Sequence, residues 1–142
     1  MKSFKQYYLE AQNLENFQRD ISPTSSVILK NLSGQTLILQ RGSTAPWMPN
    51  KWGLPGGAIE KNESAEEAAN RECEEEISLT PKNLKFLEKI NYPDYTIHLF
   101  SGEISGDPEL NFEHSNFAFI NRSDLNKYDL VPGLFTLLEK YM

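Results

Sequence analysis

Six glutamates crowd one stretch of the chain, residues 64–77, where Arg71 is the one basic residue. If this stretch is a helix, at about 100° per residue Glu72, Glu75 and Glu76 share one face. Like charges three and four residues apart each cost about 0.2–0.5 kcal/mol, and no lysine lies on that face to relieve them. Hard divalent cations take oxygen ligands, so Mg²⁺ bound there would turn the repulsion into binding. The alternative interpretation is a solvated acidic face.

The sequence around these glutamates predicts how they are positioned. Ser64 and Glu67 have the S-x-x-E spacing of a capping box, which marks a helix N-terminus. A stripe of smaller and apolar residues beside the acidic face is expected to enter the core, and it contains Ala69, Cys73 and Ile77. The preceding Pro55-Gly56-Gly57 lets the backbone approach closely, and a carbonyl there could be a further oxygen ligand. Taken alone, such a segment is more often only a turn.

Read together, these residues resemble the Nudix box, G-x5-E-x7-R-E-U-x-E-E-x-G-U, in which U is apolar. The matching residues are Gly57, Glu63, Arg71, Glu72, Cys73, Glu75, Glu76 and Leu79. Every fixed polar position matches, and Cys73 fills an apolar position. Ser78 stands where the family usually has glycine. A glycine there would end the helix in a left-handed conformation, which costs a serine roughly 1 kcal/mol but removes no metal ligand.

The resemblance implies a metal-dependent pyrophosphohydrolase that cuts a diphosphate bond in a nucleoside diphosphate-linked substrate. It implies two or more Mg²⁺ or Mn²⁺ ions, held by Glu72, Glu75, Glu76 and the Gly56 carbonyl. Glu63 and Arg71 would pair with each other and support the loop and helix. The substrate would be a small nucleotide: a nucleoside triphosphate, ADP-ribose, a nucleotide sugar or a dinucleoside polyphosphate. The alternatives are a non-catalytic nucleotide-sensing Nudix domain and an RNA 5′-pyrophosphohydrolase.

The family often carries another acid, or a histidine, in a loop before the last strand, which here is the segment 111–115. The resemblance makes Glu113 a candidate for a further metal ligand or for the general base. His114 is the alternative base, because the pKa of histidine lies near working pH. Glu72 is a third candidate for the base. Plain surface residues are the competing interpretation of the loop pair.

Substrate contacts are predicted from residue type and position. Arg41 ends an expected strand at the mouth of the site, and a guanidinium suits bidentate recognition of phosphate. Trp52 and Tyr95, and also Trp47 and Tyr92, could stack on a base. An ordinary surface arginine and ordinary core aromatics are the alternatives.

Strands and helices alternate along the chain, which favours an α/β or α+β class with a mixed sheet between helices. The resemblance sharpens this to a Nudix-like α/β/α sandwich. The expected strands are 25–30 and 36–40, joined as a hairpin, then 52–59, interrupted at 55–57, and 84–91, 95–101 and 117–120. The expected helices are 64–77 and 134–141.

The N-terminal residues 1–17 place aromatic and apolar residues at helical spacing. We therefore divide the chain into an amphipathic helical extension, residues 1–20, and a Nudix hydrolase domain, residues 21–142. The extension could pack on the domain or serve as the pairing surface of a homodimer.

Bulk composition limits the remaining classes. The 142 residues suit one domain, and the net charge of −6 argues against general nucleic-acid binding, which needs a basic footprint. No apolar run approaches the roughly 20 residues that span a bilayer, so we expect no membrane partner. The single cysteine excludes an internal disulfide and suits a reducing compartment. We therefore expect a cytoplasmic protein.

Overall fold

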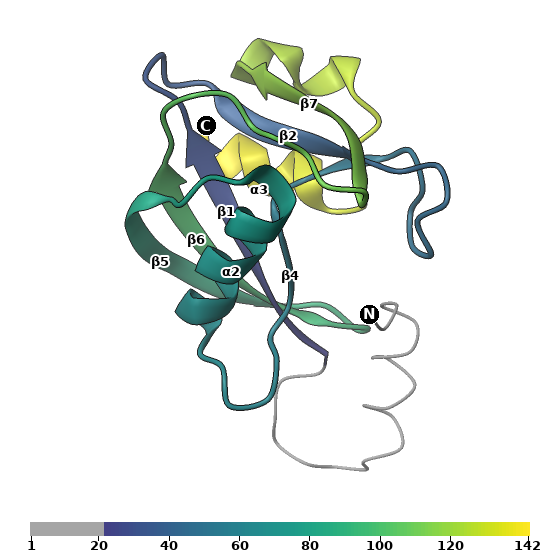
Figure 1. The fold of residues 1–142 in the computed structure, drawn as a ribbon. Helices are drawn as coiled ribbons and strands as arrows, with labels where there is room; N and C mark the ends of the chain where they lie inside the picture. The colour runs from purple at the N-terminus through teal and green to yellow at the C-terminus, as the bar shows by residue number, and fades with distance from the viewer. Residues whose placement is uncertain (1–21) are drawn as a thin grey trace.

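The structure is a computed structural model that describes residues 22–142, a mixed β-sheet with helices on both faces (Figure 1). The predicted helix of residues 1–17 and the extension of residues 1–20 lie outside the described residues. The strands are β1 (Pro23–Lys30), β2 (Thr36–Arg41), β3 (Trp52–Gly53), β4 (Gly56–Ala58), β5 (Lys82–Asn91), β6 (Thr96–Glu103) and β7 (His114–Ile120). The helices are α2 (Ala65–Ile77), the 3₁₀ helix η1 (Arg122–Lys127) and α3 (Leu134–Tyr141).

The sheet forks between β1 and β2. These strands pair at Lys30 and Thr36, next to their hairpin turn. Farther from the turn, β4 takes the place beside β1, and β3 takes the place beside β2. The opposite edge of β1 runs parallel to β6, which also pairs with β5, and the opposite edge of β2 pairs with β7. The two halves of the sheet therefore separate away from the turn, and a cleft opens between them.

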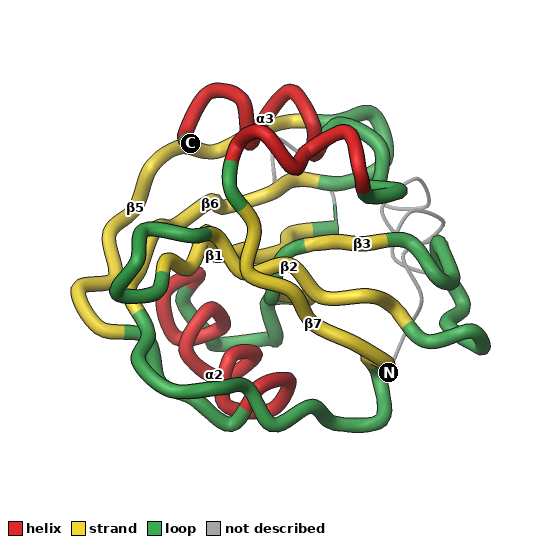
Figure 2. Tube along the Cα trace, turned by 90° about the horizontal axis from the view of Figure 1, so that it is seen from above, coloured by secondary structure: helices red, strands yellow, loops and turns green. Residues whose placement is uncertain are grey.

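Alternate residues of the central strands supply two hydrophobic cores, because successive side chains of a strand point to opposite faces. Val27 and Leu29 of β1 join the cluster that contains the apolar stripe of α2, whereas Ile28 joins the cluster beneath α3. Figure 2 shows α2 and α3 on opposite sides of the sheet. This arrangement confirms the predicted α/β/α sandwich with its mixed sheet.

The local signals at the two ends of α2 are also confirmed. The Ser64 hydroxyl accepts a hydrogen bond from the Glu67 backbone N–H, and the Glu67 carboxylate accepts one from the Ser64 N–H. At the other end, Ser78 adopts the left-handed conformation with φ 57° and ψ 31°. The predicted core stripe of Ala69, Cys73 and Ile77 is fully buried. The helix is thus fixed at both ends and along one side.

The observed elements differ most from the predicted ones at three places. The predicted strand 52–59 is two short strands, β3 and β4. Strand β3 pairs with β2, whereas β4 pairs with β1. Strand β7 begins at His114 rather than Phe117, because its polar first residues pair with the end of β2. The helix η1 was not predicted. Each difference depends on pairing or packing with a distant segment.

Over residues 22–142, every helix falls short of the combination of length and apolar character that crossing a bilayer requires.

Candidate active site

The cleft in the forked sheet brings together chain segments that are far apart in sequence. Its walls include Thr24 and Ser26 of β1, Gly56 and Gly57 of β4, and Arg41 at the end of β2. The β5–β6 turn, the β2–β3 loop and the segment before α3 complete it. Because β4 leads through a short loop into α2, the acidic face of the helix lies beside this cleft.

Two of the predicted ligands on α2, Glu72 and Glu76, are buried, with exposed fractions of 2% and 3%. Burial raises the pKa of Glu72 to about 7, although the neighbouring Arg71 guanidinium opposes the rise. Burial also raises the pKa of Glu76 well above its ordinary value, and the charge of Glu72 adds to the effect. Ionising a buried carboxylate costs free energy unless a positive charge lies beside it. A cation bound here would therefore lower the cost of ionising Glu72 and Glu76.

Gly56 and Gly57 allow these carboxylates to lie against the backbone of β4. The Gly56 N–H donates a 2.8 Å hydrogen bond to Oε1 of Glu76. Gly56 has φ 152°, and a Cβ there would lie 2.1 Å from the Ser25 carbonyl oxygen. A Cβ on Gly57 would lie 2.7 Å from the Glu72 carboxylate. Any larger residue at either position would therefore displace the strand or the acid. The hydrogen bond from Gly56 was not anticipated, although the paired glycines signal a close approach.

Arg71 connects the loop to the helix. Its guanidinium donates to both carboxylate oxygens of Glu63, at 2.7 and 2.9 Å, and to the Ala58 carbonyl at 2.9 Å. The hydrogen bonds to Glu63 raise the pKa of Arg71, and the same contact lowers the pKa of Glu63. Arg71 also contacts Glu72 at 2.9 Å and the half-exposed Glu75 at 3.3 Å. The guanidinium therefore holds two of the predicted ligands as well as the loop.

The loop before β7 ends at Glu113, and β7 begins at His114, next to the C-terminal half of α2. The backbone N–H of Asn111 donates to the Glu76 carbonyl at 3.3 Å, and the Gly42 N–H donates to the Glu113 carbonyl at 3.0 Å. These bonds tie the loop to the helix and to the end of β2. The His114 side chain is 4% exposed, and burial lowers its pKa to about 4, so the ring is neutral at neutral pH. The pair is not a plain surface pair, because His114 is buried.

Ligand atoms of Glu76, Glu113 and His114 all lie within 4.8 Å of one another. Among the described residues, this is the group with the mutual spacing that one metal ion needs. Glu72 and Glu75 lie outside it, because both are drawn toward Arg71. The structure thus places the four predicted acids and the predicted histidine near α2 but does not bring all of them to one point.

Arg41 lies between the cleft and the acidic group, which is formed by Glu76, Glu113 and His114. Its Nε donates to the Trp47 carbonyl at 2.6 Å, and its guanidinium carbon lies 5.3 Å from the centre of the Trp47 ring. Burial lowers the pKa of Arg41, whereas the charges of Glu76 and Glu113 oppose the change. The guanidinium is therefore held by Trp47 and interacts electrostatically with two carboxylates.

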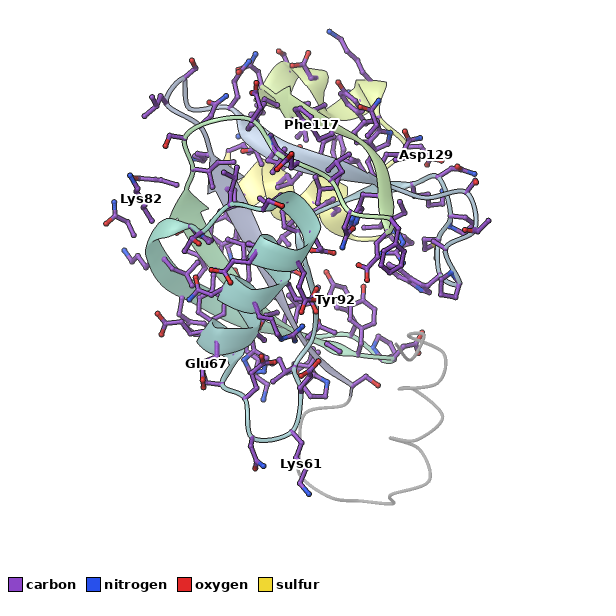
Figure 3. All side chains as sticks on the ribbon, viewed as in Figure 1. Lys61, Glu67, Lys82, Tyr92, Phe117 and Asp129 are labelled. Atoms are coloured by element: carbon purple, nitrogen blue, oxygen red, sulfur yellow. The ribbon has the colours of Figure 1, made fainter. Side chains whose placement is uncertain are left out.

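Aromatic side chains form one wall of the cleft. Tyr92 and Tyr95 stack with ring centres 5.0 Å apart, and Trp47 meets Tyr95 edge-on at 6.2 Å. Tyr92, labelled in Figure 3, lines the same cleft as Gly56 and Gly57 of β4. Burial raises the pKa of Tyr95 to about 12, so its hydroxyl stays protonated near neutral pH. Trp52 is not among the residues that line the cleft, because its ring packs on Tyr128 in the core on the α3 side.

The donor set suits a divalent cation. Burial raises the pKa of Glu72 and of Glu76. Nδ1 of His114 is buried without a hydrogen-bond partner among the described residues. Carboxylate oxygens are the ligands that Mg²⁺ and Mn²⁺ prefer, and a cation would favour the ionised forms of both glutamates.

Known proteins resemble this chain in both sequence and fold. An 8-oxo-dGTP diphosphatase from Escherichia coli K12 is 39% identical over 75 residues, which cover 51% of this chain and 57% of that protein. An RNA pyrophosphohydrolase from Pasteurella multocida is 40% identical over 65 residues, which cover 46% of this chain and 30% of that protein. The chain thus matches less than two thirds of the length of either relative.

The fold agrees with these sequence matches. The crystal structure of a MutT NUDIX hydrolase from Burkholderia pseudomallei has a TM-score of 0.74 and 23% identity, and it covers 85% of this chain and 98% of that one. The family model of the NUDIX domain matches residues 21–141, which include the glutamate helix, the cleft and the loop before β7. The chain therefore belongs to the NUDIX domain family.

Proposed function

We propose that this protein hydrolyses the diphosphate bond of a small nucleotide with the help of a divalent cation, and that a nucleoside triphosphate is its preferred substrate. The observation that best supports this proposal is the burial of Glu72 and Glu76 beside a cleft that also contains Arg41 and stacked aromatic rings. The net charge of −6 repels a polyphosphate, and bound cations would offset that repulsion. The acidic end of α2 is placed to hold them.

The ligand roles that we propose are those that the resemblance to the family implies. Glu72, Glu75 and Glu76 hold Mg²⁺ or Mn²⁺, with Glu113 and the Gly56 carbonyl as further ligands. When bound, such ions neutralise phosphate charge and lower the pKa of water. Arg41 orients a phosphate oxygen, because its own position is fixed by Trp47. Four carboxylates near α2 provide enough oxygen ligands for two or more ions.

Glu72 accepts the proton of the attacking water. Its pKa is about 7 in the metal-free site, and a bound cation would lower it, so the carboxylate would be ionised and able to accept a proton. Its carboxylate is held by Arg71 and rests against Gly57, so it is positioned before substrate arrives. Positioning and charge stabilisation supply most of the rate in phosphoryl transfer.

The cleft and the relatives together favour a mononucleotide. Tyr92, Tyr95 and Trp47 offer ring faces and edges to a base, while Arg41 lies between them and the acidic group. This order matches a base followed by a phosphate chain. The Escherichia coli relative is described as an 8-oxo-dGTP diphosphatase, which is consistent with such a substrate.

An RNA 5′-pyrophosphohydrolase is the second candidate, because the Pasteurella multocida relative carries that name. The same end of α2 would serve a triphosphorylated RNA end. The acidic net charge disfavours a long RNA chain, which would be repelled beyond its first nucleotides.

The test is a Mg²⁺- and Mn²⁺-dependent assay of phosphate and pyrophosphate release. The panel contains oxidised and ordinary (deoxy)nucleoside triphosphates, ADP-ribose, nucleotide sugars, dinucleoside polyphosphates and triphosphorylated RNA. We expect cleavage of a nucleoside triphosphate with kcat/KM at least about 10-fold above the other classes, lost on chelation of the metal. Preferred cleavage of RNA would favour the second candidate. Tight nucleotide binding without turnover of any compound would indicate a sensor.

Replacement of Glu75 by glutamine tests the site itself. Glu75→Gln is expected to lower kcat by at least about 10²–10³-fold, because the site loses a ligand charge. The fold should persist because the Glu75 side chain is 50% exposed. Glu74→Gln is the matched control, since Glu74 is exposed and contacts Thr80 away from the cleft. Equal activity of the two variants would show that the acidic face of α2 is not the catalytic site.

A further inference from the structure

One nitrogen atom near the acidic group lacks a partner. Nδ1 of His114 is buried and accepts or donates no hydrogen bond among the described residues. A buried polar atom without a partner costs about 1–3 kcal/mol, so such an atom calls for an explanation. Oε2 of Glu76 lies 3.8 Å from this nitrogen, which is too long for a hydrogen bond.

The distance of 3.8 Å between Nδ1 of His114 and Oε2 of Glu76 is suitable for two ligands of one ion. Ligand atoms that each lie 2.0–2.6 Å from a cation are separated from one another by roughly 3–5 Å. Glu113 adds a carboxylate oxygen to the same group, and all three ligand atoms lie within 4.8 Å of one another. The group therefore combines two oxygens with one nitrogen.

The surrounding backbone keeps His114 at this place. As the first residue of β7, it pairs with Arg41 at the end of β2. The preceding residues are bonded to α2 through Asn111 and to Gly42 through Glu113. His114 is therefore fixed from both the sheet and the helix, and its ring is enclosed next to Glu76 rather than free to turn outward.

We propose that His114 is a nitrogen ligand of a divalent cation bound by Glu76 and Glu113, and that this ligand makes the protein favour Mn²⁺ over Mg²⁺. The inference rests on the proposed function, because it assigns a ligand and a metal preference to the same site. Imidazole binds first-row transition metals well, whereas Mg²⁺ prefers oxygen ligands. Glu72 and Glu75, held by Arg71, are left to serve a second ion.

The experiment measures nitrogen coordination directly. The wild-type protein is prepared with ¹⁵N-labelled or unlabelled histidine, loaded with one and then two equivalents of Mn²⁺ alone, and studied by pulsed electron paramagnetic resonance. The expected spectrum shows hyperfine coupling from a directly bound nitrogen that changes with the isotope. Because the chain has two histidines, such coupling arises from His98 or His114.

Two variants assign the signal. His114→Gln should lose the nitrogen coupling, and its affinity for Mn²⁺ should fall at least about 10-fold, whereas its affinity for Mg²⁺ should change less than about 3-fold. His98→Gln is the matched control and should keep both the coupling and the Mn²⁺ affinity. Circular dichroism checks that each variant is folded, and the isotope experiment on wild type stands without either variant.

The outcomes separate this inference from the proposed function. Absence of nitrogen coupling in wild type at both loadings overturns the inference, even if nucleotides are hydrolysed. Coupling that survives in folded His114→Gln also overturns it. Coupling that disappears in His114→Gln supports the inference, even if no nucleotide on the panel is cleaved, in which case the proposed hydrolysis alone fails.

Discussion

Arg41 lines the cleft and is the residue that we propose for contact with a substrate phosphate. Its planar guanidinium can form two parallel hydrogen bonds to a phosphate, which a lysine ammonium cannot. We expect Arg41→Lys to raise KM for the nucleotide about 10-fold with a smaller change in kcat, measured by steady-state kinetics. Arg122→Lys is the control, because Arg122 is exposed and bonds to the carbonyl of Met142. Similar KM values for both variants would remove Arg41 from substrate binding.

Glu72 links the site to stability. Its folded pKa of about 7 lies above the ordinary 4.5, so the folded state binds the proton more tightly than the unfolded state. Its stabilising contribution is therefore complete below about pH 4.5 and is lost as pH rises through about 7. The shift corresponds to roughly 3 kcal/mol.

The resulting prediction concerns metal-free protein in a chelator. The free energy of unfolding in urea should decline between pH 5 and pH 7.5, and the decline should be smaller in Glu72→Gln, which cannot ionise. Glu76 retains a trend of the same sign, so the variant should flatten the profile only in part. Parallel profiles for the two proteins would show that Glu72 does not titrate in this window.

At the scale of the element, α2 ends in strain. Ser78 holds a left-handed conformation that glycine adopts without steric cost, and its N–H donates a 3.1 Å hydrogen bond to the Glu74 carbonyl. Ser78→Gly should raise the free energy of unfolding by about 0.5–1 kcal/mol, with the greater entropy of unfolded glycine reducing the gain. Ser78→Ala keeps the Cβ and should bring no such gain in the same urea titration. An equal gain in both variants would attribute the effect to the lost hydroxyl.

At the scale of the molecule, cation binding should stabilise the fold, because the site exists only when α2, β4 and the loop before β7 come together. A ligand that binds the folded state alone, at 100 times its Kd, adds about 2.7 kcal/mol. We expect Mg²⁺ to produce a gain of this size in urea unfolding, and Glu75→Gln to reduce it. Sodium chloride at matched ionic strength is the control, because any salt screens the net charge of −6. Equal effects of the two salts would indicate screening without a specific site.

Local sequence determined the central helix of this protein. The capping box at Ser64, the core stripe through Cys73 and the face that carries Glu72 and Glu76 depend on contacts within a few residues, so their spacing can be read directly. The spacing of the glutamates also carried the resemblance to the family that the match over residues 21–141 then established.

Only the tertiary structure decided the shape of the cleft and the surroundings of each functional group. The fork of the sheet, the burial of His114 and the different positions of Trp47 and Trp52 all depend on which distant strands pair. The sequence predicted a loop where His114 begins β7, because a polar run gives no sign that it will pair with the end of β2. Likewise, spacing placed Glu72 and Glu75 on one face, but the contacts of Arg71 with Glu63 and Ala58 decided where those two carboxylates lie. Local periodicity fixes which way a side chain leaves its own helix, whereas its partners are set by long-range packing.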